Sequence, residues 1–154
     1  MRTVQQWFAE YDESHHNKVN ELFHWVCIPL IMFSLLGLMS EVPLFVVPWS
    51  SLANLATVFI ALALVFYLRL SWSLALGMAL VSALMIAGHI GLRELGWAPL
   101  WQICLGLFVV GWIGQFIGHK IEGKKPSFFK DVQFLLIGPI WLLAAVYRRA
   151  GVAY

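Results

Sequence analysis

Long apolar runs separated by short polar segments form the main pattern of this chain. Four of the runs are each close to the ~20 residues that a helix needs to cross the hydrocarbon core of a bilayer. They cover residues 22–39, 52–68, 74–92 and 100–118. We therefore predict an all-α fold, an integral membrane bundle of four transmembrane helices in a single domain over residues 1–154.

A short amphipathic helix is predicted before these runs, over residues 3–14. Its apolar side chains recur at the spacing of one helical face, at Val4, Trp7, Phe8 and Tyr11. The opposite face carries glutamine and glutamate. This pattern is typical both of a helix lying in the membrane interface and of a helix packed on the protein, and the residues favour neither.

A fifth apolar run lies near the C-terminus, at residues 132–146. It is shorter than the others and is interrupted by Gly138-Pro139. We expect a short helix that either crosses a locally thinned bilayer or enters the membrane and returns. Arg148 and Arg149 follow it, and the preference of arginine for the cytoplasmic side mildly favours the re-entrant alternative.

The composition agrees with the membrane class. Hydrophobic residues make up 61% of the chain and charged residues 12%, and the mean hydropathy is +0.81. A soluble domain is about half apolar and about a quarter charged. The net charge of +2 is too small to indicate a nucleic-acid partner, so we expect membrane lipid and no nucleic acid around the protein.

Basic residues predict the orientation of the bundle. Arg2 and Lys18 precede the first apolar run, and four lysines lie within residues 119–130, after the fourth run. Residues 40–51, between the first two runs, contain no lysine or arginine. Because cytoplasmic loops carry an excess of basic residues, we expect the N-terminus in the cytoplasm.

This orientation sorts the five histidines. It places His15, His16, His24 and His119 at the cytoplasmic end, and His89 near the opposite end of the third run, where a packing role is expected. On one continuous helix, His16 shares a stripe with His24, whereas His15 points away from it. A bend before Asn17, a good N-cap, would instead turn His15 toward His24. Both geometries remain open.

The fourth run supplies a second polar stripe. Gln115, His119 and Glu122 fall at i, i+4 and i+7, so they share one helical face. Gly114 and Gly118 lie on the same helix at a spacing that permits close approach of a neighbouring helix. Polar groups inside a membrane are costly unless satisfied, which makes this stripe a candidate functional site.

Imidazoles near a carboxylate are typical ligands of iron, zinc or copper, with Asn20 and Gln115 as groups that could orient the rings. Three alternatives stay open beside a metal enzyme. The histidines could be solvated interface residues, two of them could bind haem in an electron carrier, or all could be structural in a non-catalytic scaffold or lipid-binding protein.

Two segments of the chain resemble a known family. Residues 11–31 contain the pattern Tyr-x3-His-x4-Asn-x3-His-x4-Pro, at Tyr11, His15, Asn20, His24 and Pro29. Residues 112–131 resemble its second signature, at Gln115, Phe116, Gly118, His119, Glu122 and Pro126. Together they are similar to the 2-hydroxy fatty acid dioxygenases, whose fungal members act in phytosphingosine breakdown.

The resemblance implies an Fe(II) enzyme that uses O2 to remove one carbon from a 2-hydroxy fatty acid. Carried over to this chain, His15, His24 and His119 are the expected iron ligands and catalytic residues. Asn20, Gln115 and Glu122 are expected around the cofactor, with Asn20 and Glu122 as ligands or as supports of ligands. We expect a bacterial inner membrane protein with this site on the cytoplasmic side.

Overall fold

A computed structural model describes residues 2–44, 53–125 and 133–154 of the protein. The described chain forms six helices, which confirms the all-α class. Their bounds are α1 Val4–Asp12, α2 Lys18–Ser40, α3 Leu55–Leu68, α4 Trp72–Leu95, α5 Leu100–Glu122 and α6 Phe134–Ala150.

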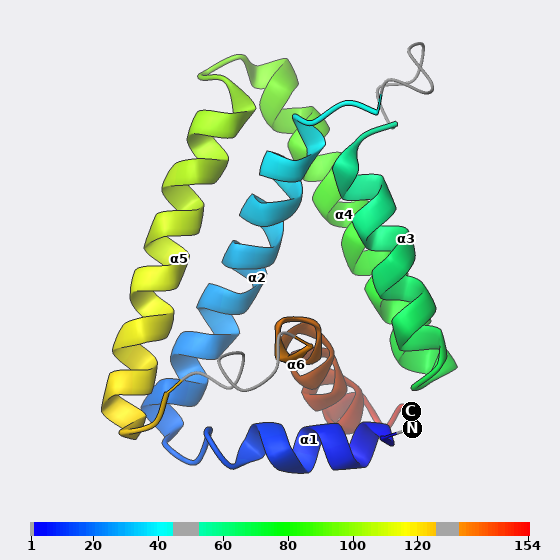
Figure 1. Cartoon of the computed structure of the whole chain (residues 1–154), viewed down its shortest axis with the longest axis vertical. Coiled ribbons are helices and arrows are strands. Elements are labelled where there is room, and N and C mark those ends of the chain that lie inside the picture. Colours follow the sequence, from blue (N-terminus) through cyan, green and yellow to red (C-terminus); the bar gives the residue numbers. More distant parts are fainter. Residues whose placement is uncertain (1, 45–52, 126–132) are drawn as a thin grey trace.

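Two pairs of helices form the two sides of the bundle, and α6 lies between the pairs at one end (Figure 1). Helices α2 and α5 pack along most of their length, and α3 packs against α4 (Figure 1). Helix α1 lies across one end of the bundle, and α6 contacts α1, α2 and α4 at that same end. Both termini lie there too. We call it the α1 end.

Helix α1 packs on the protein rather than presenting its apolar face to lipid. Thr3 caps it, since the Thr3 side chain accepts the Gln6 N–H and the Gln6 side chain accepts the Thr3 N–H. Its predicted apolar face is buried. The ring of Trp7 lies 5.3 Å from that of Phe134 on α6, so the apolar face serves as a packing surface within the fold.

The predicted count of four membrane spans is met only in part. Helices α2, α4 and α5 are long and apolar enough to cross a bilayer. Helix α3 is apolar but only 14 residues long, and the predicted start of its run at residue 52 lies outside the described residues. The predicted fifth run corresponds to α6, apart from residue 132, which is also outside them. The structure describes α6 as a continuous 17-residue helix with Pro139 inside it.

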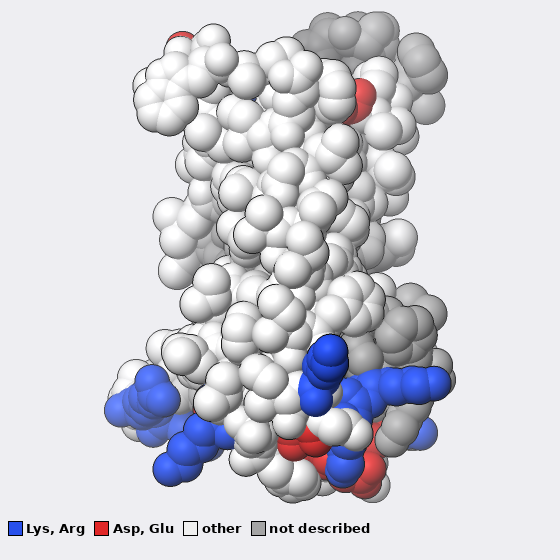
Figure 2. All heavy atoms as spheres, turned by 90° about the vertical axis from the view of Figure 1, so that its left-hand side faces the viewer, with Lys and Arg blue, Asp and Glu red and all other residues white. Residues whose placement is uncertain are grey.

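The charged side chains are distributed as a membrane protein requires. On the face shown in Figure 2, lysine and arginine gather at one end, acidic residues lie at both ends, and the middle of the molecule carries neither sign. Many large apolar side chains of α4 and α5 are exposed, such as Leu84 at 64% and Val110 at 61%. Lipid is the solvent in which such exposure costs nothing, so these helices form an integral membrane protein.

Glycines let α5 approach α2 closely; the close approach was predicted, although its partner helix was not. A Cβ atom at Gly111 would lie 2.7 Å from Cγ1 of Ile31, and one at Gly118 would lie 2.6 Å from Oδ1 of Asn20. Both distances are shorter than a van der Waals contact, so only glycine fits the observed separation. This contact brings the polar stripe of α5 against the start of α2.

Candidate metal centre

Three histidines from three separate segments meet at the α1 end of the bundle. His15 lies in the turn between α1 and α2, His24 lies in the second turn of α2, and His119 lies near the end of α5. Their side chains are 8%, 1% and 5% exposed. One nitrogen from each ring lies within 4.8 Å of the other two, a spacing that could hold one metal ion.

The turn before α2 decides which of the two adjacent histidines joins this cluster. Oδ1 of Asn17 accepts the backbone N–H of Val19, so a new helix begins here, as predicted. The chain therefore bends between α1 and α2. His15 stacks on Tyr11 with ring centroids 4.1 Å apart and faces His24, whereas His16 is exposed.

Backbone hydrogen bonds select the nitrogen that two of the rings direct inward. Nδ1 of His15 lies 2.5 Å from the carbonyl oxygen of Tyr11, and Nδ1 of His24 lies 2.8 Å from that of Asn20. Because a carbonyl only accepts, both Nδ1 atoms carry the proton of the neutral ring. Both Nε2 atoms then present lone pairs, and they face each other across 2.8 Å.

This donor set fits a metal ion. Two facing lone pairs repel, and a cation bound by both removes the repulsion. With metal–nitrogen bonds of about 2.0–2.1 Å, two imidazoles at right angles around one ion have donor atoms about 2.9 Å apart. In addition, Nδ1 of His119 is buried without a hydrogen-bond partner among the described residues. Imidazole ligands suit iron, zinc and copper.

The environment of His15 keeps its ring neutral. Burial lowers the pKa of His15 to about 4, although the Tyr11 carbonyl opposes this shift. The nearby imidazoles of His119 and His16 contribute to this net lowering of the pKa, and the Glu122 carboxylate opposes it. The ring is therefore neutral at pH 7, which is the state that binds metals.

Glu122 supports the turn and does not point into the cluster. Its Oε1 accepts the backbone N–H of His16 at 3.0 Å, and its Oε2 accepts that of Asn17 at 2.9 Å. Oε2 also accepts from Nδ2 of Asn20 at 3.0 Å, and that amide donates to the Ser14 carbonyl as well. Among the described residues, all three hydrogen bonds of the Glu122 carboxylate thus hold residues 14–20 in place.

Asn20 also orients an imidazole, though through its backbone. Its carbonyl is the acceptor for Nδ1 of His24, so the residue links the Glu122 carboxylate to one ring of the cluster. Oδ1 of Asn20 is buried without a partner among the described residues, close to Gly118. The predicted supporting position of Asn20 therefore has a geometric basis, while its role at a metal stays a prediction.

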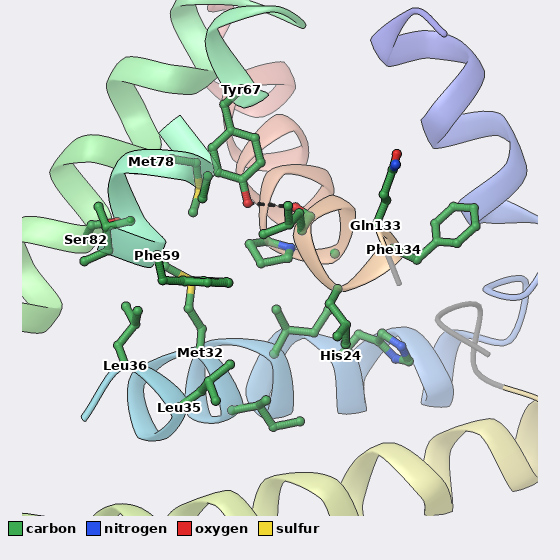
Figure 3. A pocket seen from close by; sticks show the side chains of 18 of the residues that line it. His24, Met32, Leu35, Leu36, Phe59, Tyr67, Met78, Ser82, Gln133 and Phe134 are labelled. Atoms are coloured by element: carbon green, nitrogen blue, oxygen red, sulfur yellow. Dashed lines mark hydrogen bonds between the residues drawn. The ribbon is translucent and has the colours of Figure 1, made fainter. Parts of the chain in front are cut away.

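An apolar cavity of about 460 Å³ opens beside the cluster. This volume lies in the range of roughly 300–1,000 Å³ that is usual for small-molecule sites. All six helices contribute to its wall, and His24 and His119 line it. Figure 3 shows His24 toward one side of the cavity and Leu36 and Ser82 toward the other. Along α2, His24 and Leu36 are separated by about 18 Å.

Gln115 lines this cavity, one helical turn before His119. The side chain is 6% exposed, and in the described part of the chain it has no hydrogen bond to an imidazole. The predicted role of Gln115 in fixing ring orientation therefore finds no contact here. Backbone carbonyls orient His15 and His24 instead.

His89 stands apart from the cluster, as the orientation argument predicted. It is buried, and Nε2 donates to the Phe33 carbonyl at 2.9 Å. Its ring packs on that of Phe33 at 4.2 Å. His89 thus joins α4 to α2 as a packing residue.

The sequence placed Tyr11 on an apolar face and in a family pattern, and a bend before Asn17 would let it face His24 together with His15. In the structure Tyr11 stacks on His15, supplies the carbonyl that orients this ring, and lines the cavity. The spacing of four residues between Tyr11 and His15, together with the bend at Asn17, is the signal that could have indicated this contact. The cavity wall itself left no comparable signal, because apolar membrane residues look alike whether they face lipid or a cavity.

Comparisons with known proteins agree with these observations. The family model described as 2-hydroxy-palmitic acid dioxygenase Mpo1-like matches residues 1–150. The chain is similar to the 2-hydroxy-palmitic acid dioxygenase of Saccharomyces cerevisiae, with 29% identity over 143 residues, which are 92% of this chain and 78% of the yeast protein. No solved structure matches the chain.

Proposed function

The chain belongs to the family of 2-hydroxy-palmitic acid dioxygenase Mpo1-like proteins, and on this premise we propose that it is an Fe(II)-dependent dioxygenase of 2-hydroxy fatty acids. It would use O2 to shorten its substrate by one carbon. His15, His24 and His119 would hold the iron. When bound, iron supplies the one-electron chemistry that O2 needs to react.

The observation that carries this proposal is that the histidine cluster lies directly beside the apolar cavity. Three buried imidazoles with two inward lone pairs lie at one end of an apolar cavity, and two of the three line it. A fatty acid has the matching chemistry, since its oxygens suit a polar cluster and its tail suits an apolar cavity. A haem held by His15 and His24 is less favoured, because two ligands on opposite sides of one haem cannot have their nitrogens 2.8 Å apart.

The protein's own residues have three tasks in this scheme. The Tyr11 and Asn20 carbonyls keep the His15 and His24 rings in the metal-binding tautomer. The Glu122 carboxylate keeps the turn with His15 against α5. The apolar wall excludes water from the carbon chain and positions its oxygen-bearing end at the histidines.

We also propose that the site faces the cytoplasm, because the α1 end carries the basic residues that predict this orientation. The relative named above is a yeast protein, so a bacterial inner membrane stays a prediction. The substrate would enter from the bilayer. Its tail would then lie in the cavity, and its polar end would lie at the cytoplasmic end of the bundle.

Metal analysis combined with an activity assay tests the proposal. We expect about one iron per chain, and formation of the C15 fatty acid from 2-hydroxypalmitate under O2. His24→Ala and His119→Ala should each lose bound metal and reduce turnover by at least about 100-fold. His16→Ala is the matched control, since His16 is exposed and should keep both properties.

A protein that binds no metal at these residues would refute the proposal. Wild-type behaviour of both His→Ala variants would favour the alternative of a non-catalytic scaffold or lipid-binding protein with structural histidines. A strong haem absorption band in the purified protein would favour the electron carrier.

A further inference from the structure

The cavity contains a polar side chain that the metal cluster does not use. Gln115 lines the cavity on α5 and is only 6% exposed, yet its carboxamide has no hydrogen-bond partner among the described residues. A buried amide without partners is costly, and more so within a membrane, where few waters can satisfy it. Such a group indicates a ligand that completes its hydrogen bonds.

The position of Gln115 along α5 limits which part of a ligand it can reach. It lies four residues before His119, which is about 6 Å along the helix axis and away from the α1 end. The carboxamide is therefore at the boundary between the histidine cluster and the apolar wall. In a fatty acid whose carboxylate lies at the cluster, this boundary corresponds to the first carbons of the chain.

The chemistry of the amide matches one substituent at that place. A carboxamide both donates and accepts, and so does a hydroxyl group, whereas a carboxylate only accepts. Resting on the function proposed above, we propose that Gln115 recognises the 2-hydroxyl group and makes the site select 2-hydroxy fatty acids over unsubstituted ones. A site built to hydrogen-bond a hydroxyl discriminates strongly against the analogue that lacks it, because its own polar group is then left without a partner.

Tyr11 is the competing candidate for this role. It also lines the cavity, is 5% exposed, and its hydroxyl has no partner in the described part of the chain. Its phenol also both donates and accepts, but its ring stacks on that of His15, which places Tyr11 beside the histidine cluster, where a carboxylate would lie. A donor suits a carboxylate oxygen, which both kinds of fatty acid possess. Removal of the Tyr11 hydroxyl should therefore weaken both ligands alike.

Binding measurements under nitrogen, where no turnover occurs, separate these roles. The full chain in detergent with Fe(II) would be titrated with 2-hydroxypalmitate and with palmitate, in competition with a fluorescent fatty acid. Gln115→Met keeps the size of the side chain and removes the amide. We expect it to weaken 2-hydroxypalmitate about tenfold or more and to leave palmitate within about twofold.

Two further variants serve as controls in this binding experiment. Met32→Leu changes an apolar residue of the same cavity and should alter both affinities by the same factor. Tyr11→Phe should also weaken both acids equally. If Gln115→Met still binds palmitate, this binding also shows that the variant is folded.

Each other outcome contradicts the inference. If the wild type prefers 2-hydroxypalmitate and Gln115→Met keeps that preference, another group recognises the hydroxyl. A selective loss in Tyr11→Phe would assign the role to Tyr11. Equal wild-type affinity for both acids would refute selection by Gln115 but leave the dioxygenase proposal standing, whereas binding of neither acid would refute both.

Discussion

Nδ2 of Asn20 lies 3.0 Å from Oε2 of Glu122, although 102 residues separate them in the sequence. With the two backbone N–H groups that Glu122 also accepts, this contact ties the last turn of α5 to the first turn of α2. The helix that carries His119 thereby holds the turn that carries His15. The geometry of the cluster thus depends on a residue that does not face it.

Replacement of Glu122 by glutamine tests this dependence. One of the two acceptor oxygens becomes an NH2 group, which would face an N–H donor. We expect metal affinity to fall about 10–100-fold and the free energy of unfolding to fall by about 1–3 kcal/mol. Chelator competition and thermal unfolding measure the two quantities. Glu94→Gln, at an exposed position near the end of α4, should change neither. Unchanged metal affinity in Glu122→Gln would contradict the role of this carboxylate in positioning His15.

The contact between α5 and α2 makes a second prediction. Gly118→Ala would place a methyl group 2.6 Å from Oδ1 of Asn20 and 3.0 Å from Cβ of Phe23. Such overpacking should cost about 1–3 kcal/mol of stability and displace the adjacent His119, with a loss of bound metal. Gly106→Ala on the same helix meets nothing within 4 Å and serves as the control. Equal melting temperatures for the two variants would show that the helices can separate at no cost.

The low pKa of His15 predicts how the metal-free protein responds to acid. Its pKa is about 4 in the folded protein and about 6.5 in an unfolded chain. Between these values the unfolded chain binds a proton that the folded chain does not, so the stability contribution of His15 is lost as the pH falls from 6.5 to 4. The loss is at most about 3 kcal/mol.

Thermal unfolding in detergent across this pH range measures the effect. His15→Gln lacks the titrating ring and should show a shallower decline than the wild type. The exposed neighbour gives the control, and His16→Gln should follow the wild-type curve. Parallel curves for all three proteins would mean that burial of His15 does not disfavour its protonation.

The far side of the cavity should limit the length of the substrate. Ser82 lies there on α4 and is 6% exposed, so Ser82→Leu would fill part of the space (Figure 3). We expect turnover of 2-hydroxypalmitate to fall about tenfold, while a 2-hydroxy acid several carbons shorter retains most of its turnover. Leu80→Phe adds bulk to an exposed position of the same helix and should change neither rate. An equal loss for both chain lengths would argue that the tail does not reach Ser82.

Local patterns in the sequence predicted much of this structure. The apolar spacing of residues 4–11 identified the face of α1 that is buried, though not what covers it, and Asn17 marked the start of α2. Gly114 and Gly118 indicated a close helix contact, although the partner helix was not predicted. These features depend on residues within one or two helical turns of each other, and such local features can be predicted from a single sequence.

Features that depend on distant contacts could not be predicted in the same way. Whether His15 or His16 faces His24 depends on the angle of the turn, which Glu122 holds from the far end of the chain. Glu122 itself has the residue type of a metal ligand, and only the structure shows its three hydrogen bonds to the turn and to Asn20. The packing of α6 against α1, α2 and α4 likewise follows from tertiary contacts, since its length and charges were compatible with two arrangements.

His119 lies about a hundred residues after His15 and His24 in the sequence, and this separation has a consequence for biosynthesis. His15 and His24 leave the ribosome long before His119, and Glu122, whose carboxylate holds the turn, is made only at the end of α5. A nascent chain that lacks α5 therefore contains two of the imidazoles without their partner or their support. If the proposed metal site is formed by all three histidines, it can be completed only in chains whose α5 has been inserted, and truncated copies would lack it.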